Sequence, residues 1–524
     1  MCNERGGVFK MQTLISYVNK WAITRGEQIA ISDEENIITY KELKDIICKL
    51  QKFYLDYGLE RGDIVGIACI KDYMLIAHYL ALFGLGISIV PLPCEANLNE
   101  LTKIILDIKP KYIIISSKTC IINQGIKHKI YIDGNNTSNS YIINGITELI
   151  SICESIKYNK IVIKADPVET FNFNDFIYDL ENENEKQYFN LTSGSTANVK
   201  IANVSTSKII ANAIAVNDYF ILNKNDNYCC MFSTDMHPHE LFARSLIAGC
   251  GTILLKAKSI KNMNEYIVKK NITQIMAVPS IYNTLLDIGT DKKYWNNVKY
   301  ILSSGEPTNY ILRKNFYSIT GKKIIPVWGS TETTGVVFYV PERKVLDSNN
   351  YIGIPFKGYQ VKIDDNTSEL LIKGKSCFDG YRNEKKDNLF TLDGYYKTKD
   401  IAEKDENNIY KFCGRTDDIV KINGRKINLA LIKNKLESLQ FVHNIEIVHT
   451  QTSKSENILG IFCVKNEKKI LNDEIIRNQL NNILNTPIRF EIINLESMPT
   501  LSSNKINRQA LKNILLQKLS IYNR

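Results

Sequence analysis

The feature that most constrains the fold is a regular alternation of helix-like and strand-like segments between residues 72 and 335. Each amphipathic stretch is followed, after a short turn, by a run rich in β-branched residues. This alternation predicts parallel strands joined by crossover helices on both faces of a sheet, and so an α/β fold. The pairs are 98–108 before 111–116, 239–249 before 252–256, 263–270 before 272–278, 282–288 before 298–304, and 310–318 before 323–329.

Parallel sheets of this kind bind ligands beyond the carboxyl ends of their strands. We therefore expect three loops at one such edge: the loop after the strand at 188–191 (YFNL), the loop at Gly305 and the loop at Gly329.

After Gly335 the pattern changes to short strands and turns, which predicts a small β subdomain over about 341–415. From Asp417 onward a compact α+β pattern continues to the end of the chain. We predict a large N-terminal domain over 1–416 and a smaller C-terminal domain over 417–524. A chain of 524 residues is long enough for several such units, and 44% hydrophobic with 23% charged residues suits a globular enzyme.

The net charge is +10, and residues 417–524 hold 16 Lys and Arg against 10 Asp and Glu, a local charge of +6. Such a surface is simply solvated, or it meets an acidic protein, an anionic membrane or nucleic acid. There is no basic run of five or more and no zinc-finger pattern, so we expect no nucleic-acid partner.

Twelve cysteines are scattered from Cys2 to Cys463 without a C-x-x-C motif, which favours a reducing, cytoplasmic location. The N-terminus lacks the basic and then apolar pattern of a signal peptide. The longest apolar stretch, 74–90, contains His78 and is interrupted by Gly84 and Gly86. It predicts a buried helix followed by a buried strand rather than a membrane span.

Residues 191–200 (LTSGSTANVK) form a stretch rich in hydroxyls and glycine that ends in a lysine. Hydroxyls and exposed backbone N–H groups donate well to phosphate oxygens, although the spacing is not that of the common G-x-x-x-x-G-K-[ST] loop. Four more stretches accompany it: SSGEP (303–307), WGSTET (328–333), YYKTKD (395–400) with GRTDDIVKINGRK (414–426), and PTLSSNKINRQAL (499–511).

In their order and spacing these stretches resemble the adenylate-forming superfamily of acyl- and aryl-CoA synthetases, luciferase and peptide-synthetase adenylation domains. The resemblance runs from about residue 38 to 511, nearly the whole chain. It implies that the first stretch embraces the phosphates of ATP. The residues concerned are Thr192, Ser193, Gly194, Ser195, Thr196 and Lys200.

The same loop departs from the family pattern T-S-G-S-T-G-x-P-K-G at three positions. Ala197 and Ile201 replace glycines, and Val199 replaces proline. Loss of two glycines should stiffen the loop, because glycine alone adopts positive φ freely.

The resemblance also assigns the middle stretches to the nucleotide. Glu332 is implied as a Mg²⁺ ligand and Thr331 as a contact of the α-phosphate, and a carboxylate suits this hard cation. The further ATP/AMP-binding residues that it implies are Gly305, Glu306, Pro307, Trp328, Gly329 and Ser330.

For the C-terminal motifs, the resemblance implies that Asp400 accepts hydrogen bonds from the ribose hydroxyls, supported by Arg415. Asp417 would be the hinge, Gly424 would border a thiol tunnel, and Lys505 would be the catalytic lysine. Three further positions depart from the family: Lys399 and Asn504 replace glycines, and Lys426 replaces a phosphate-contacting arginine, losing its bidentate geometry.

The chemistry implied is ATP-dependent activation of a small carboxylic acid as acyl-AMP with release of pyrophosphate. The acyl group is then transferred to the thiol of CoA or of a carrier protein's phosphopantetheine, after the mobile C-terminal domain has rotated. The positive charge of residues 417–524 suits an acyl or peptidyl carrier protein, since such carriers are typically acidic.

Two registers for the acid pocket remain open in MFSTDMHPHELF (231–242). In one, Asp235 pairs the amino group of an amino acid, with Glu240 in step; in the other, His237 and His239 line the entrance for an acyl or aryl acid. The second is favoured by SSGEP and TDDIVK. A third alternative is a non-catalytic nucleotide-binding homologue, against which the retained Lys200, Glu332, Asp400 and Lys505 argue.

Overall fold

The computed structural model describes residues 13–68, 71–92, 104–115, 162–164, 188–192, 200–234, 237–347, 350–382, 384–422, 425–437, 445–451, 456–464, 473–484, 488–499 and 506–522. The chain forms two compact units. Unit 1 comprises Met1–Gln360 and Lys373–Tyr396, and unit 2 comprises Val361–Ile372 and Lys397–Arg524.

The larger sheet of unit 1 is mostly parallel. Six neighbouring strands, β13, β12, β11, β9, β10 and β1, pair in parallel, with β14 and β15 added antiparallel at one end and β2 at the other. Their bounds are β1 (Ile29–Ser32), β2 (Ile37–Thr39), β9 (Asn227–Cys230), β10 (Gly251–Ile253), β11 (Gln274–Ala277), β12 (Tyr300–Ser303), β13 (Ile324–Ser330), β14 (Gly335–Tyr339) and β15 (Tyr351–Pro355).

A second sheet of unit 1 has the order β6-β5-β3-β4-β7-β8. All its neighbours are parallel except β7 and β8, which form an antiparallel pair. The strands are β3 (Ile64–Ala68), β4 (Ser88–Pro91), β5 (Tyr112–Ile115), β6 (Val162–Lys164), β7 (Tyr188–Thr192) and β8 (Lys200–Val204).

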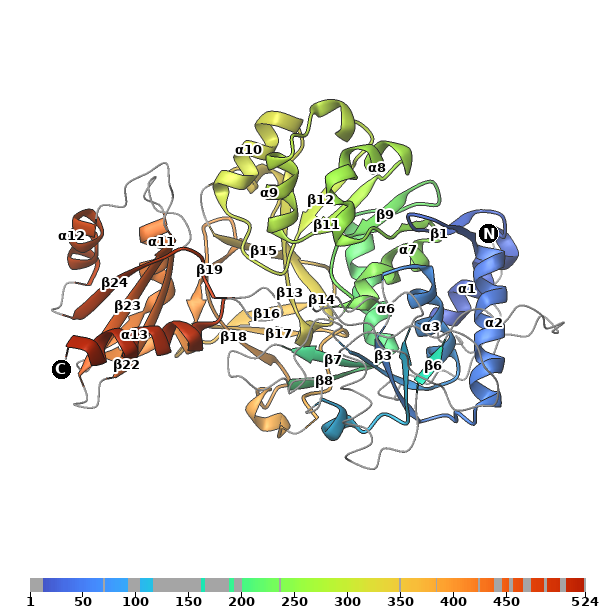
Figure 1. The fold of residues 1–524 in the computed structure, drawn as a ribbon, viewed down its shortest axis with the longest axis horizontal. Helices are drawn as coiled ribbons and strands as arrows, with labels where there is room; N and C mark the ends of the chain where they lie inside the picture. Colours follow the sequence, from blue (N-terminus) through green and yellow to red (C-terminus); the bar gives the residue numbers. More distant parts are fainter. Residues whose placement is uncertain are drawn as a thin grey trace. The chain divides into compact units, whose positions relative to one another are not determined.

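Helices cover these sheets, and Figure 1 shows α8, α9 and α10 around β9, β11 and β12, with α1–α3 grouped near β1 and β3. Several begin at a side-chain cap that supplies the otherwise unpaired N–H groups of the first turn, as Thr39 and Glu42 do in a capping box at α2. The helices are α1 (Leu14–Thr24), α2 (Tyr40–Asp56), α3 (Tyr73–Gly84), α6 (Thr206–Tyr219), α7 (Ala243–Ala248), α8 (Met263–Lys269), α9 (Pro279–Asp287) and α10 (Tyr310–Thr320), with 3₁₀ turns η1 (Pro238–Leu241), η2 (Ala257–Asn262), η3 (Lys292–Trp295), η4 (Thr331–Thr333), η5 (Glu342–Lys344) and η6 (Lys386–Asn388).

Unit 2 starts with four short strands and continues as an α+β domain. In it β18 pairs with β19, β20 with β21, and β22 with β23 antiparallel, whereas β24 adds to β23 in parallel. The elements are β16 (Gln360–Ile363), β17 (Glu369–Lys373), β18 (Tyr396–Lys404), β19 (Tyr410–Arg415), η7 (Thr416–Asp418), β20 (Ile419–Ile422), β21 (Arg425–Asn428), α11 (Leu429–Glu437), β22 (Ile445–Gln451), β23 (Asn457–Val464), α12 (Asp473–Leu484), β24 (Arg489–Leu495) and α13 (Arg508–Tyr522).

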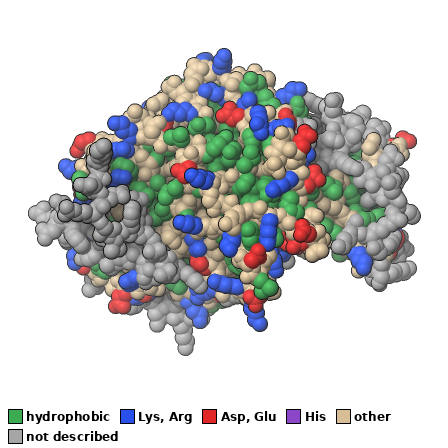
Figure 2. Space-filling model, turned by 180° about the vertical axis from the view of Figure 1, so that it is seen from behind, with side chains coloured by type: hydrophobic (Ala, Val, Ile, Leu, Met, Phe, Trp, Pro, Cys, Tyr) green, Lys and Arg blue, Asp and Glu red, His purple; other side chains and the backbone are tan. Residues whose placement is uncertain are grey.

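The predicted α/β class is confirmed, and so is the interpretation of the apolar stretch 74–90. Residues 74–84 of α3 are buried throughout, and β4 follows as a buried strand. Within the described ranges, no helix combines the length and the apolar composition needed to cross a bilayer. The described surface in Figure 2 intersperses Lys and Arg with Asp and Glu rather than gathering them in one basic strip.

The expectation that three loops share one sheet edge is wrong. β7, which precedes the loop at 193–199, pairs with β4 and β8 in the second sheet, whereas the Gly305 and Gly329 loops follow β12 and β13 of the larger sheet. The reason is that strands from residues 64–204 pair among themselves. The predicted division at residue 417 remains a prediction, because compactness alone groups β18 and β19 with the C-terminal elements.

Two glycines set the turn between β13 and β14. Gly329 pairs with Val336 across a bulge, and a Cβ added to Gly329 would lie 2.5 Å from Val336 Cα and closer still to the Gly335 carbonyl oxygen. Backbone atoms cannot move aside as a flexible side chain can. The strands β13 and β14 can therefore approach each other here only without a side chain at Gly329.

We predict that Gly329→Ala lowers the free energy of unfolding by about 3 kcal/mol or more, since overpacking against backbone is costly. Gly358→Ala is the matched control. Gly358 has a φ of +97° but nothing within 4 Å of an added Cβ, so it should show only backbone strain of about 1–2 kcal/mol. Thermal unfolding of both variants checks this, and equal losses would contradict the close-approach argument.

Candidate active site

The predicted phosphate loop spans the tip of the β7–β8 hairpin. Thr192 and Lys200 are paired across the two strands, so the chain leaves β7 at Thr192 and returns at Lys200. Ser193, Gly194, Ser195 and Thr196 lie outside the described residues, as do Ala197 and Val199. The hairpin nevertheless fixes both ends of the loop.

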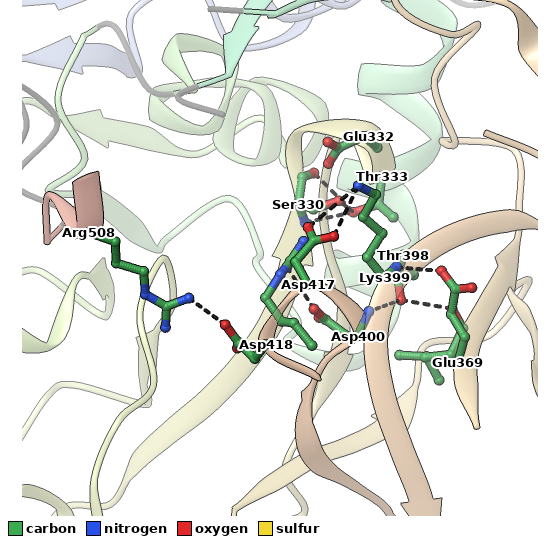
Figure 3. A network of polar contacts seen from close by, with 12 residues as sticks. Ser330, Glu332, Thr333, Glu369, Thr398, Lys399, Asp400, Asp417, Asp418 and Arg508 are labelled. Atoms are coloured by element: carbon green, nitrogen blue, oxygen red, sulfur yellow. Dashed lines mark hydrogen bonds and ion pairs between the residues drawn. The ribbon is translucent and has the colours of Figure 1, made fainter. Parts of the chain in front are cut away.

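The turn that carries Thr331 and Glu332 joins β13 to β14. Ser330 N–H donates to Thr333 Oγ1 at 2.9 Å (Figure 3), and Thr333 Oγ1 donates to Gly335 O at 2.7 Å. Thr334 adopts a left-handed φ of 57°, which reverses the chain direction. These bonds hold the buried side of the turn, so that Thr331 and Glu332 remain half-buried rather than enclosed.

Tyr381 connects Glu332 to Lys200. Its hydroxyl donates to Glu332 Oε1, and Lys200 Nζ lies 4.9 Å from the centre of its ring. Lys200 Nζ also forms an ion pair with Glu384 Oε1 at 2.5 Å. The structure thus brings together two predicted nucleotide-binding residues that are 132 positions apart in the sequence.

The Gly305 loop follows β12 directly. Gly305 has a φ of +88°, and Gly305, Glu306 and Pro307 are all exposed. Thr308 Oγ1 donates to Ser303 Oγ at 2.8 Å, which ties the end of the loop back to the strand. Trp328, on the adjacent β13, is half-buried and packs edge-on against Phe338 at 5.5 Å.

His237 and His239 lie beside β7 with their rings 5.7 Å apart. Asn190 Nδ2 lies 2.9 Å from His237 Nδ1, and His239 Nε2 lies 3.1 Å from Thr334 O. A carbonyl only accepts, so His239 Nε2 carries the proton and Nδ1 is an acceptor. Burial lowers the pKa of His239 to about 4, which keeps the ring neutral. Asp235 lies outside the described residues.

Two acceptors of this group have no hydrogen-bond partner among the described residues: His239 Nδ1 and Asn190 Oδ1. Both side chains are buried, at 2% and 0% exposure. A buried acceptor without a partner costs about 1–3 kcal/mol, and such an atom calls for a donor.

Glu240 plays a different part from its neighbours. Its carboxyl is buried against Gly335, close to Asn212 of α6, and accepts from the Val336 N–H. Burial raises the pKa of Glu240 to about 7, opposed by Arg244 and by the hydrogen bond from Val336. Glu240 therefore supports the β14 strand behind the Glu332 turn.

Unit 2 holds the other predicted nucleotide residues. Asp400 is buried and accepts from Arg415 Nη1 at 2.7 Å, with the two residues in register across β18 and β19. Lys399 has the left-handed φ of 63° that suits the family's glycine, and its Nζ lies 3.4 Å from Asp417 (Figure 3). The Lys399 N–H donates to Glu369 Oε1 at 2.7 Å.

The segment after Lys505 is anchored within the same unit. Arg508, the first residue of α13, bonds to Asp418 (Figure 3) and, at 2.8 Å, to Glu446. Lys505 and Gly424 lie outside the described residues, and of Lys426 only the backbone in β21 is described. Arg508 follows Lys505 by three residues, and Asp418 is adjacent to the predicted hinge residue Asp417. Their bond thus links the segment after Lys505 to the hinge region.

Among the described residues, no group of three or more His, Cys, Asp or Glu side chains could hold a metal ion. Glu332 alone offers a half-buried carboxylate with one oxygen bonded to Tyr381. This suits Mg²⁺, which commonly binds one or two protein carboxylates and takes its other ligands from phosphates and water. A carboxylate of this kind therefore fits an ion that arrives with a nucleotide.

A family model described as AMP-binding enzyme matches residues 18–382. The chain belongs to this family. The resemblance inferred from the motifs is thereby confirmed, and the match includes Thr192, Lys200, Glu332 and Tyr381.

Curated relatives of this AMP-binding enzyme fall into two kinds. Surfactin synthase subunit 1 of Bacillus subtilis is 21% identical over 96% of this chain, and 4-hydroxybutyrate–CoA ligase 1 of Metallosphaera sedula is 22% identical over 91% of it. The chain spans 85% of the length of that CoA ligase. It spans only 14% of the length of surfactin synthase subunit 1, and less than a quarter of the length of five other peptide synthases and synthetases that it matches.

Solved structures share the fold over nearly the whole chain. ATP-bound MatB from Rhodopseudomonas palustris superimposes with a TM-score of 0.79 at 18% identity, covering 96% of this chain and 99% of that one. MenE, an o-succinylbenzoate CoA synthetase from Bacillus subtilis in complex with its acyl-adenylate intermediate, gives 0.76 at 18% identity, covering 96% and 98%.

Sequence reasoning did not identify Tyr381, Glu384 or Asn190 as site residues. Asn190 lies two residues before Thr192, the first residue of the phosphate loop, and could have been found by its place on β7. Tyr381 and Glu384 follow a turn without any recognised motif, and only the tertiary structure brings them to Lys200.

We predict that the contribution of Glu240 to the free energy of unfolding falls as pH rises between about 4.5 and 7. The reason is that burial raises the pKa of Glu240 from the ordinary 4.5 of a Glu carboxyl to about 7. Below pH 4.5 the group is neutral in both states, and above 7 the folded state bears the full cost of a buried charge. Two and a half pKa units correspond to up to about 3 kcal/mol.

Glu240→Gln removes this titration. The free energy of unfolding of the variant, minus that of the unchanged protein, should be larger at pH 8 than at pH 5. Urea unfolding of both proteins at both pH values measures this difference. A stability difference independent of pH would show that Glu240 ionises normally.

Proposed function

We propose that the protein activates a small carboxylic acid with ATP as acyl-AMP and then passes the acyl group to a thiol. The observation that carries this proposal is the placement of Lys200 and Glu332 around Tyr381. A cation and a magnesium-binding carboxylate, held together beside the end of a hydroxyl-rich loop, suit a triphosphate.

In the first half-reaction a carboxylate oxygen of the acid attacks the α-phosphorus, and the bond to pyrophosphate breaks. Mg²⁺, when bound, supplies Lewis-acid neutralisation of phosphate charge. Lys200 and the 192–200 loop hold the phosphates, Asp400 accepts from the ribose hydroxyls, and Lys505 bridges the carboxylate and the α-phosphate. Positive charge fixed in advance where negative charge develops is usually the largest catalytic contribution.

In the second half-reaction a thiolate attacks the acyl carbon, and AMP leaves with the bonding electron pair. We infer that the C-terminal domain turns about Asp417 between the two steps, removing Lys505 and admitting the thiol near Gly424. The bonds of Arg508 to Asp418 and Glu446 support this inference. They join Asp418, the neighbour of the predicted hinge residue, to the segment that follows Lys505, so that the two would move together. The acceptor is CoA or the phosphopantetheine of an acyl or peptidyl carrier protein.

The two acceptors without a hydrogen-bond partner among the described residues, His239 Nδ1 and Asn190 Oδ1, restrict the chemical class of the acid substrate. Asn190 belongs to β7, the strand that leads to the phosphate loop, and His239 contacts the Thr334 turn beyond Glu332. We propose that the acid carries a hydrogen-bond donor, a hydroxyl or an amino group. A hydroxylated acyl or aryl acid and an amino acid both satisfy this, whereas a plain hydrocarbon acid leaves the acceptors unpaired.

We place the protein in the cytoplasm. Every described cysteine, Cys48, Cys229, Cys230, Cys250, Cys377, Cys413 and Cys463, is a free thiol, which suits a reducing compartment.

We predict acid-dependent release of pyrophosphate from ATP in the presence of Mg²⁺ across a panel of acids, with and without CoA. Acids with a hydroxyl or amino group should exceed their unsubstituted analogues by 100-fold or more in kcat/KM, because sites with buried polar groups reject ligands that leave them unpaired. Asn190→Leu should reduce that preference. If the folded protein binds ATP but no acid in the panel elicits turnover, the non-catalytic alternative is favoured. If both classes of acid react at equal rates, the acid does not need a hydrogen-bond donor.

We predict that Lys505→Ala slows adenylation on the order of 100- to 1000-fold, by analogy with the loss of one preorganised donor. Thioester formation from synthetic acyl-AMP should change little, because the lysine has left before the thiol arrives. The measurement compares ATP-dependent turnover with thioester yield from supplied acyl-AMP. Equal damage to both half-reactions would contradict a rotating domain.

A further inference from the structure

Residues 379–382 lie along β8 as an added edge strand. Asp379 N–H donates to Asn203 O at 3.0 Å, Asn203 N–H to Gly380 O at 3.0 Å, and Arg382 N–H to Ile201 O at 2.9 Å. Tyr381 itself forms a β-bridge with Ala202. The position of Tyr381 is therefore fixed by its backbone, two residues from Lys200 along the neighbouring strand.

The side chain of Tyr381 contacts groups from both sheets of unit 1. Its hydroxyl donates to Glu332, which follows β13 of the larger sheet, and its ring faces Lys200 of β8 in the second sheet. Phe378 packs edge-on against the same ring at 5.0 Å, and the Phe378 N–H donates to Glu332 O at 2.8 Å. Glu332 is thus held through both its side chain and its backbone.

The hydroxyl of Tyr381 engages only one oxygen of Glu332. That bond restricts rotation of the carboxylate, and the second oxygen stays available to a hydrated cation. Without this hydrogen bond the carboxylate would rotate freely and lose its orientation. A hydrogen bond to a charged group contributes about 1.5–3 kcal/mol.

Glu384 forms an ion pair with Lys200. The ion pair is short, at 2.5 Å, and both side chains are about one-third exposed, 33% and 32%. A carboxylate offers anionic oxygens in the place where phosphate oxygens would meet the ammonium. Exposed pairs of this kind contribute about 0–1 kcal/mol, so a polyanion can displace Glu384 readily.

We propose that Tyr381 is a positioning residue that orients Glu332 beside Lys200, and that Glu384 competes with the phosphates of a nucleotide for Lys200. This inference rests on the proposed function for the identity of the ligand. It concerns binding of Mg²⁺–ATP, which precedes any reaction with the acid.

The test measures Mg²⁺–ATP binding to the full chain by calorimetry, without acid, at several Mg²⁺ concentrations. Glu384→Gln should bind Mg²⁺–ATP about two- to fivefold more tightly, because Lys200 no longer has to be released. Tyr381→Phe, which keeps the ring, should require about tenfold more Mg²⁺ for half-maximal ATP affinity. Binding of ATP in the presence of EDTA should be unchanged in Tyr381→Phe.

The matched control is Asp379→Asn, which removes the neighbouring ion pair between Asp379 and Lys208 (3.4 Å) on the same edge strand. It should leave both measurements unchanged. Unaltered or weaker ATP binding in Glu384→Gln would overturn the role of Glu384, and an unaltered Mg²⁺ requirement in Tyr381→Phe would overturn that of Tyr381.

These outcomes are separable from failure of the proposed function. If the unchanged protein binds Mg²⁺–ATP but activates no acid, the function fails while the binding comparison still decides the inference. If the unchanged protein does not bind Mg²⁺–ATP, both are overturned. Should Tyr381→Phe fail to fold, as judged by circular dichroism, the Glu384→Gln comparison still decides the claim for Glu384.

Discussion

The close approach of the β13 and β14 backbones at Gly329 and Gly335 is the constraint on which the candidate site depends. No Cβ can be placed at Gly329, and one at Gly335 would meet the side chains of Glu240 and Asn212. Because the strands meet this closely, residues 331–334 are forced into a tight turn, and the bonds of Thr333 lock it. Thr331 and Glu332 owe their position to this turn rather than to the strand that precedes it.

A chain of buried and partly buried hydrogen bonds supports the same turn. Thr333 O accepts from Ser376, whose hydroxyl meets Tyr359 at 2.6 Å, and Tyr359 accepts from Asn212, which also donates to Val336 O. Buried networks of this kind are costly if any member is lost, so they specify one arrangement. In unit 2, Arg508 serves a similar purpose by joining two acidic residues, Asp418 and Glu446. Each part of the proposed reaction therefore rests on its own rigid support.

The chain aligns with most of a CoA ligase and with a segment of a much longer peptide synthase. Buried acceptors at His239 and Asn190 suit a polar acid rather than a hydrocarbon one. Lys399, in a left-handed conformation where the family has glycine, accepts backbone strain of about 1–2 kcal/mol, and its side chain gains an ion pair with Asp417. Lys399 thus forms a charged link to the predicted hinge residue Asp417.

The sequence by itself determined the α/β class, the buried helix and strand at 74–90, and the family, because hydrophobic periodicity and motif spacing are properties of the chain alone. It also placed Thr192, Lys200 and Glu332 in one site by resemblance. It did not reveal that the strands divide into two sheets, which made the expectation of a single shared edge wrong. Strand partners are chosen by packing between distant segments, as β4 and β7 are. For the same reason Tyr381 and Glu384 carry no local signal: their part in the site arises from an edge strand that pairs with β8, and only the tertiary structure decides that pairing.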